Sequence, residues 1–173
     1  MNELIPNFCK AYNFSREEAS ILIDNMELIE IKKNEKIIEQ GKCNSDLYLI
    51  NSGIMRVYAV VDSQDITEWF ASRANLVFSI WSYANNLKSR TTIETITDAT
   101  AYYISRAKLL ELFNSSIKSS NLGRKLIEQY SMITENWLMD WEKPTAKARY
   151  LTLMKMDPEI IKNVPLQQIA SYL

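Results

Sequence analysis

Short runs rich in β-branched and aromatic residues follow one another through most of the chain, separated by turn-forming residues. The runs cover residues 28–31, 36–39, 47–50, 55–61, 65–70, 91–96 and 101–104. Strands at this spacing, with polar turns between them, are typical of an antiparallel sandwich or jelly roll. Asn51-Ser52-Gly53 places a glycine where a hairpin needs a positive φ, which favours the same interpretation.

Helical patterns flank this β-rich region. Ser15-Arg16-Glu17-Glu18 is a capping box that predicts a helix through about Asn25. From about Arg106 the apolar period becomes helical, which predicts a short helix over 107–113 and a long one over about 120–142. Pro144 then breaks the helical pattern. Further helices are expected over 146–156, which Asp157-Pro158 ends, and from residue 164 onward.

The predicted long helix carries an apolar stripe with spacings of 4, 3, 4 and 4 residues. The stripe consists of Leu126, Tyr130, Ile133, Trp137 and Trp141. Because this spacing is close to that of a coiled-coil seam, the stripe predicts a homodimer interface. The alternative is that the stripe belongs to the core of its own chain.

Several residue counts exclude common chemistries. The sequence has no histidine, three glycines and two cysteines, Cys9 and Cys43. These counts exclude Ser-His and Cys-His dyads, the usual zinc and haem sites, glycine-rich nucleotide loops and all-thiolate iron–sulfur clusters. Only carboxylates such as Asp65 and Glu68 remain for catalysis, without supporting spacing. We therefore expect no metal, no cofactor and no enzyme activity.

The cysteine usage fits a reducing cytoplasm. The chain has neither an apolar run of about 18 residues nor a basic start followed by an apolar region. Neither a membrane span nor a signal peptide is expected.

The charge of the chain is unevenly distributed. Residues 1–142 carry 15 Lys and Arg against 19 Asp and Glu, a net −4, whereas residues 143–173 carry five against two, a net +3. A basic segment behind an acidic body indicates a module that faces a polyanion, although chance over so short a segment is the alternative.

The order of these parts resembles that of Crp/Fnr-type transcription regulators. Gly41, Asp46-Leu47-Tyr48-Leu49-Ile50 and Gly53-Ile54-Met55-Arg56-Val57-Tyr58 resemble the cyclic-nucleotide-binding-domain signature of that family. Residues 145–151 look like the helix after the family's hinge, and residues 165–173 look like the first helix of its helix-turn-helix. The resemblance covers nearly the whole chain.

The resemblance implies an α+β fold, in which an antiparallel jelly roll with flanking helices is followed by a dimerisation helix and an incomplete winged helix-turn-helix. The expected boundaries are 1–113 for the sensor roll, 114–142 for the dimerisation helix and 144–173 for the DNA-binding part. The implied partners are DNA, a second copy of the chain, RNA polymerase and a small-molecule effector. Gln167, Lys147 and Arg149 are the candidate contacts to the DNA backbone. A ligand-binding regulatory module without DNA binding is the alternative.

The sequence departs from the family members that bind cyclic AMP. Their phosphate cassette has the form Gly-Glu, a spacer and Arg-Ser/Thr-Ala, whereas residues 74–81 contain neither the glycine nor the glutamate. Alignment on Ile93-Glu94-Thr95 puts Ser89 at the arginine position and Arg90 one residue later. On a strand such a shift turns the side chain to the opposite face, so cyclic AMP is not the expected effector.

An effector pocket is still expected inside the roll. Its candidate residues are Arg56, Trp69, Phe70, Phe78, Trp81, Ser89, Arg90 and Thr91. For the aromatic members an ordinary place in the hydrophobic core is the favoured interpretation, and lining a pocket is the alternative.

Overall fold

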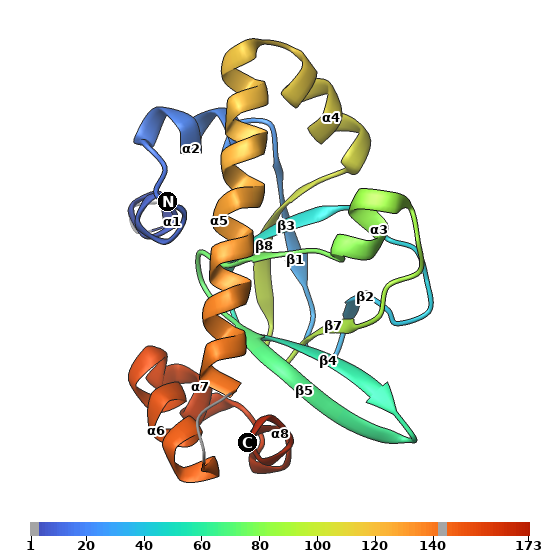
Figure 1. Cartoon of the computed structure of the whole chain (residues 1–173), viewed down its shortest axis with the longest axis vertical. Helices are drawn as coiled ribbons and strands as arrows, with labels where there is room; N and C mark the ends of the chain where they lie inside the picture. The colour runs from blue at the N-terminus through green and yellow to red at the C-terminus, as the bar shows by residue number, and fades with distance from the viewer. Residues whose placement is uncertain (1–3, 142–144) are drawn as a thin grey trace.

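Two antiparallel sheets form the centre of the molecule (Figure 1). The computed structural model describes residues 4–141 and 145–173, without the side chains of Asp140 and Trp141. Within them, one four-stranded sheet has the order β1 (Glu27–Ile31), β8 (Ala99–Ile104), β3 (Leu47–Ser52), β6 (Leu76–Val77). The other has the order β2 (Lys36–Ile38), β7 (Thr92–Thr95), β4 (Met55–Val61), β5 (Gln64–Ala71). The predicted antiparallel roll is confirmed.

Helices precede, interrupt and follow the strands. They are α1 (Leu4–Tyr12), α2 (Arg16–Ile23), α3 (Ile80–Asn85), α4 (Arg106–Asn114), α5 (Ile117–Trp141), α6 (Ala146–Met156), α7 (Pro158–Asn163) and α8 (Leu166–Tyr172). The capping box of α2 is present, with the Glu18 N–H donating to Ser15 Oγ at 3.1 Å and the Ser15 N–H donating to Glu18 Oε2 at 2.7 Å. The sequence patterns missed α1 as well as the shorter elements α3, α7 and β6.

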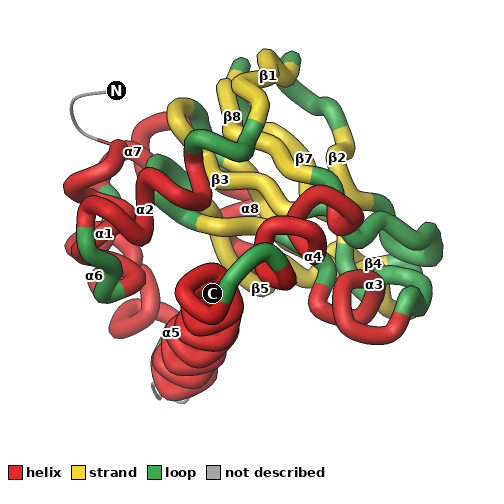
Figure 2. Tube along the Cα trace, turned by 90° about the horizontal axis from the view of Figure 1, so that it is seen from above, coloured by secondary structure: helices red, strands yellow, loops and turns green. Residues whose placement is uncertain are grey.

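The long helix α5 packs against its own chain. Its side chains Leu122 and Leu126 are each 1% exposed, in a core that includes α1, α2 and β3. Tyr130 and Ile133 are partly buried against the same core. In Figure 2, which shows α5 nearly end-on, α1 and α2 lie to one side of the sheets. A residue as buried as Leu126 cannot contact a second copy, so this part of the predicted dimer stripe is corrected to intramolecular core.

Two smaller clusters complete the packing. Inward-facing residues of both sheets, such as Ile50, Val57 and Ile93, fill the space between the sheets. A third cluster joins the roll to the C-terminal helices, where Phe70 packs with residues of α6, α7 and α8. In Figure 1 these three helices gather at the C-terminal end of α5. The expected domain boundaries stay a prediction, and the expected break at Pro144 lies outside the described residues.

Gly53 is the position where the roll most needs glycine. Its φ is +90°, and a Cβ built there would lie 2.6 Å from Ala99 Cβ and 2.7 Å from the Asp98 carbonyl oxygen. Gly41 has a similar φ of +84°, but a Cβ there would meet nothing within 4 Å. A comparison of alanine substitutions at the two positions therefore separates the cost of backbone strain from the cost of steric overlap.

We expect Gly53→Ala to lower the free energy of unfolding by about 3 kcal/mol, since it combines left-handed strain with overpacking. Gly41→Ala, the matched control, introduces only the strain and should cost about 1 kcal/mol. Urea unfolding of both variants measures the difference. Equal losses at the two positions would contradict the packing at Gly53.

Candidate effector pocket

An extra residue in β5 determines which side chains reach the pocket. Val57 of β4 pairs with Trp69, but the next residue, Tyr58, pairs with Thr67, so Glu68 is left without a partner on β4. This is a β-bulge, a feature that redirects side chains and is common beside functional sites. Residues two apart on a regular strand face the same side. The bulge instead turns Thr67 away from Trp69, toward α8.

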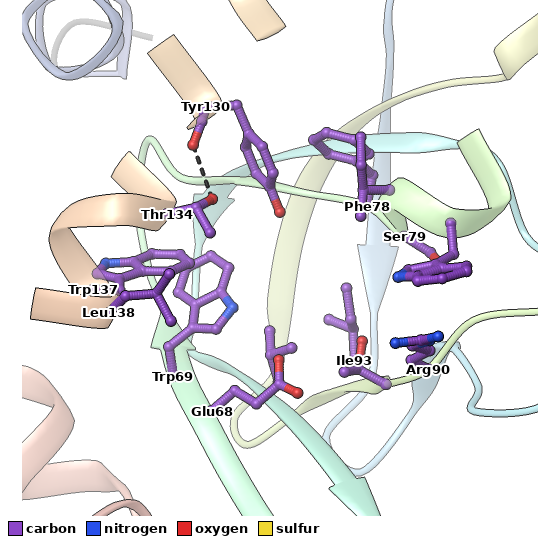
Figure 3. Close-up of a pocket in the computed structure, with 14 residues that line it drawn as sticks. Glu68, Trp69, Phe78, Ser79, Arg90, Ile93, Tyr130, Thr134, Trp137 and Leu138 are labelled. Carbon is purple, nitrogen blue, oxygen red and sulfur yellow. Dashed lines mark hydrogen bonds between the residues drawn. The ribbon is translucent and has the colours of Figure 1, made fainter. Parts of the chain in front are cut away.

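A cavity of about 400 Å³ lies where β5, α3 and α5 meet. The roll supplies Val57, Glu68, Trp69, Arg90, Thr91 and Ile93, the α3 region supplies Phe78, Ser79, Ile80 and Trp81, and α5 supplies Tyr130, Thr134, Trp137 and Leu138. Figure 3 shows the labelled side chains of α5 facing those of the roll across the space. The Trp69 and Trp137 rings are in contact, with centroids 3.7 Å apart, so this pair connects the roll to α5.

Several polar groups of the pocket wall have no hydrogen-bond or ion-pair partner among the residues that the structure describes, and two of them are buried enough for their pKa values to be raised. One is the half-buried carboxylate of Glu68, and burial raises its pKa. The other is the hydroxyl of Tyr130, whose pKa burial and the nearby Glu68 charge raise to about 12. Figure 3 shows both groups turned toward the cavity. Both are available to a ligand.

Arg90 supplies a cation at the edge of the same pocket. Its guanidinium lies 3.5 Å from the centroid of the Trp81 ring, and the side chain is exposed. Arg90, one of the predicted pocket residues, therefore lines the cavity. The strand alternation that was used to orient its side chain does not apply, because β7 begins only at Thr92. Ser89 is buried instead, with its hydroxyl donating to the Thr91 carbonyl at 2.7 Å.

The structure divides the predicted pocket residues into two groups. Trp69, Phe78, Trp81, Arg90 and Thr91 line the cavity, whereas Arg56, Phe70 and Ser89 do not. The sequence reasoning missed Glu68 as a pocket residue, and it assigned Tyr130 and Trp137 to a dimer interface. No local pattern marks the bulge at Glu68. Tyr130 and Trp137 both lie on the apolar stripe of a long helix, so the pattern could have indicated that they face their own roll.

Arg56 belongs to a network on the outer face of β4 and β5. It is 4% exposed, its Nε donates to Thr67 Oγ1 at 2.8 Å, and its Nη1 lies 3.1 Å from Asp65 Oδ2. Ser171 of α8 joins the same network by accepting the Thr67 N–H at 2.9 Å and donating to the Asp65 carbonyl at 2.6 Å. Since β5 is an edge strand, Ser171 provides the partner that a further strand would give.

The predicted DNA-backbone contacts lie on the C-terminal helices. Lys147 on α6 and Gln167 on α8 are exposed, and Arg149 on α6 is half-buried. Gln168 faces inward, and its Oε1 is buried without a hydrogen-bond partner among the described residues.

Comparisons with known proteins identify the fold. The family model described as "Cyclic nucleotide-binding domain" matches residues 28–116, and the chain belongs to this family. The sequence matches no curated protein. None of the helices in the described residues is long and apolar enough to cross a membrane.

Solved structures with the same fold include bacterial regulators. The global regulator CLP of Xanthomonas campestris, described as responsive to c-di-GMP, is similar over 84% of this chain and 74% of its own, with a TM-score of 0.69 and 14% identity. A cyclic nucleotide-binding domain from Methylobacillus flagellatus is similar over 78% and 80%, with a TM-score of 0.66 and 14% identity. The sensor domain of the transcriptional regulator DNR from Pseudomonas aeruginosa is similar over 80% and 89%, with a TM-score of 0.56 and 14% identity.

Ser171→Ala should lower the free energy of unfolding by about 1–2 kcal/mol, because it leaves the Thr67 N–H without a partner under α8. Gln167→Ala, on the exposed side of the same helix, is the control and should stay within about 0.5 kcal/mol of the parent. Thermal unfolding measures both. The α8 contact would be refuted if the Ser171 variant were as stable as the control.

Proposed function

We propose that the chain is the sensor roll and the beginning of the DNA-binding part of a homodimeric Crp/Fnr-type transcription regulator, acting in the cytoplasm and not as an enzyme. The observation that carries the proposal is the succession of α6, α7 and α8 after the long α5, on a cyclic-nucleotide-binding roll. The similarity to CLP and to the sensor domain of DNR supports it. RNA polymerase is the expected partner of the DNA-bound form. A ligand-binding module without DNA is the alternative.

On this proposal α8 is the first helix of a helix-turn-helix, which contributes contacts to the phosphate backbone more than to bases. The exposed side chains Gln167 and Lys147 support this role. Arg149 would add positive charge beside them. Residues 145–173 carry four Lys and Arg against two Asp and Glu, so this part is positive while the chain as a whole has a net charge of −1.

The dimer would use a different face of α5 from the predicted stripe. Leu126, Tyr130 and Ile133 are engaged with their own chain. Met132 and Met139, one heptad apart, are 57% and 58% exposed. Two apolar side chains at this spacing on a long helix fit a seam with a second copy. The side chain of Trp141, the last residue of the stripe, lies outside the described residues.

Cyclic AMP is not the effector on this proposal. Residues 74–81 contain no glycine and no glutamate, and Ser89, at the aligned arginine position, is buried and bonded to its own loop. A different ligand would act on α5, because Trp137 of α5 forms part of the pocket wall. Ligand binding could then bias the dimer geometry, and with it the separation of two DNA-binding parts that must match half-sites about one helical turn apart.

DNA binding can be tested by fluorescence anisotropy with a random-sequence duplex. We expect weak binding that falls as salt rises, and Lys147→Glu should weaken it about threefold or more by removing a phosphate contact. Lys36→Glu makes the same charge change on β2, in the sensor roll, and should have little effect. Binding that is absent at low salt, or equally weakened by both variants, would favour the module without DNA.

The dimer can be tested by sedimentation velocity at micromolar concentration. The parent should sediment as a dimer, and Met132→Glu combined with Met139→Glu should give a folded monomer, because it places like charges against each other at the seam. Ile117→Glu introduces the same kind of side chain at an 84% exposed position at the other end of α5 and should leave the dimer intact. A monomeric parent would remove the dimer from the proposal.

A further inference from the structure

The negative charge inside the pocket has no partner of its own. Glu68 is half-buried in the bulge of β5, and the described residues offer its carboxylate no hydrogen bond and no ion pair. Burying a charged group without a partner is costly unless something else satisfies it. A cationic hydrogen-bond donor on a ligand would do so directly.

The surroundings of Glu68 are aromatic. Trp69 and Trp137 are in ring contact beside it, and the Phe78 and Tyr130 ring centroids are 4.4 Å apart across from them. A cavity of about 400 Å³ with such walls suits a small flat molecule of one or two rings. Aromatic side chains attract a cation as well as a ring, because the faces of their π-systems are negative.

Arg90 carries the opposite charge but is placed differently. Its guanidinium is already engaged with the Trp81 ring at 3.5 Å, and its side chain is exposed, so solvent screens its charge. No ion pair joins Arg90 to Glu68 among the described residues. In Figure 3 Arg90 lies at one side of the cavity, whereas Glu68 is next to Trp69. The more buried of the two charges is therefore the negative one.

We propose that the pocket takes an arylalkylamine, whose alkylammonium group lies against the Glu68 carboxylate while its flat aromatic ring packs among Trp69, Phe78 and Trp137. This inference rests on the proposed sensor role of the roll and gives its ligand a chemical class.

Three naphthalene compounds of similar size but different charge show which ligand charge the pocket prefers. They are 2-(1-naphthyl)ethylamine, 2-(1-naphthyl)ethanol and 1-naphthylacetate, which are cationic, neutral and anionic at pH 7. Calorimetric titration of the whole chain should give the amine about tenfold tighter binding than the alcohol or the acid. The amine should also raise the melting temperature, because it binds only the folded state.

Variants then assign the preference to one side chain. Glu68→Gln, which is nearly isosteric, should reduce the affinity for the amine to that for the alcohol. Glu135→Gln removes the same charge from the exposed face of α5 and is the matched control, which should keep the preference. Arg90→Gln should keep it too. Melting temperatures of the free variants check that each one is folded.

Several results would overturn the inference: tightest binding of the acid, loss of binding in Arg90→Gln but not in Glu68→Gln, or no binding of any of the three compounds. Cyclic AMP belongs in the same series at about 1 mM, and stabilisation by cyclic AMP but not by the amine would also overturn it. None of these measurements involves DNA. If the chain prefers the amine but does not bind DNA, the proposed ligand class stands and the proposed regulator function does not. If it binds DNA but does not prefer the amine, the regulator function stands and the ligand class does not.

Discussion

The bulge in β5 divides three consecutive residues between two opposite sides of the sheet. Thr67 faces outward to Arg56 and to Ser171 of α8, while Glu68 and Trp69 line the pocket. A regular strand would place Thr67 and Trp69 on one face. In that arrangement Arg56 would lose its Thr67 partner while 4% exposed, and the edge of β5 would lose its bond to α8. The single extra residue thus allows one strand to serve the pocket and the C-terminal helices together.

The long helix α5 is shared in a similar way. Its N-terminal half carries Leu122 and Leu126 into the main core, and its C-terminal half carries Trp137 to the pocket. A helix that uses one face for both purposes has only the opposite face left for a second copy. The exposed methionines Met132 and Met139 lie within the C-terminal half, so a dimer seam there would be close to the pocket. The pocket and the proposed interface are then on two sides of the same few turns of α5.

The sequence predicted the roll well because strand alternation, turn residues and the capping box of α2 are local signals. It missed α1, although the buried residues Leu4, Phe8 and Tyr12 are spaced by four, because its sequence has no capping-box pattern like the one that marks the slightly shorter α2. The site was harder to predict. Trp69 and Phe78 were found from their aromatic character, but Glu68 depends on a bulge that only pairing with β4 defines.

Strand alternation could not give the orientation of Arg90, for a related reason. Strand parity holds only within a strand, and the residues before Thr92 follow an irregular path whose direction the sequence pattern does not give. The apolar stripe on α5 was ambiguous for another reason. Apolar residues have the same spacing in a dimer seam as on a helix face that packs against the core of its own chain. Only the neighbours of Leu126 distinguish the two, and these are contributed by distant parts of the chain.

The place of the pocket between β5 and α5 has a mechanical consequence. The Trp69–Trp137 contact joins strand to helix at 3.7 Å, and the residue two positions before Trp69 holds α8 through Ser171. A ligand that fills the cavity contacts both tryptophans and can therefore tilt one against the other. Because Thr67, Glu68 and Trp69 are adjacent in the bulge, such a displacement would change the backbone at Thr67 as well. The proposed DNA-binding part would then sense the pocket by two routes, through the position of α5 and through the hold of β5 on α8.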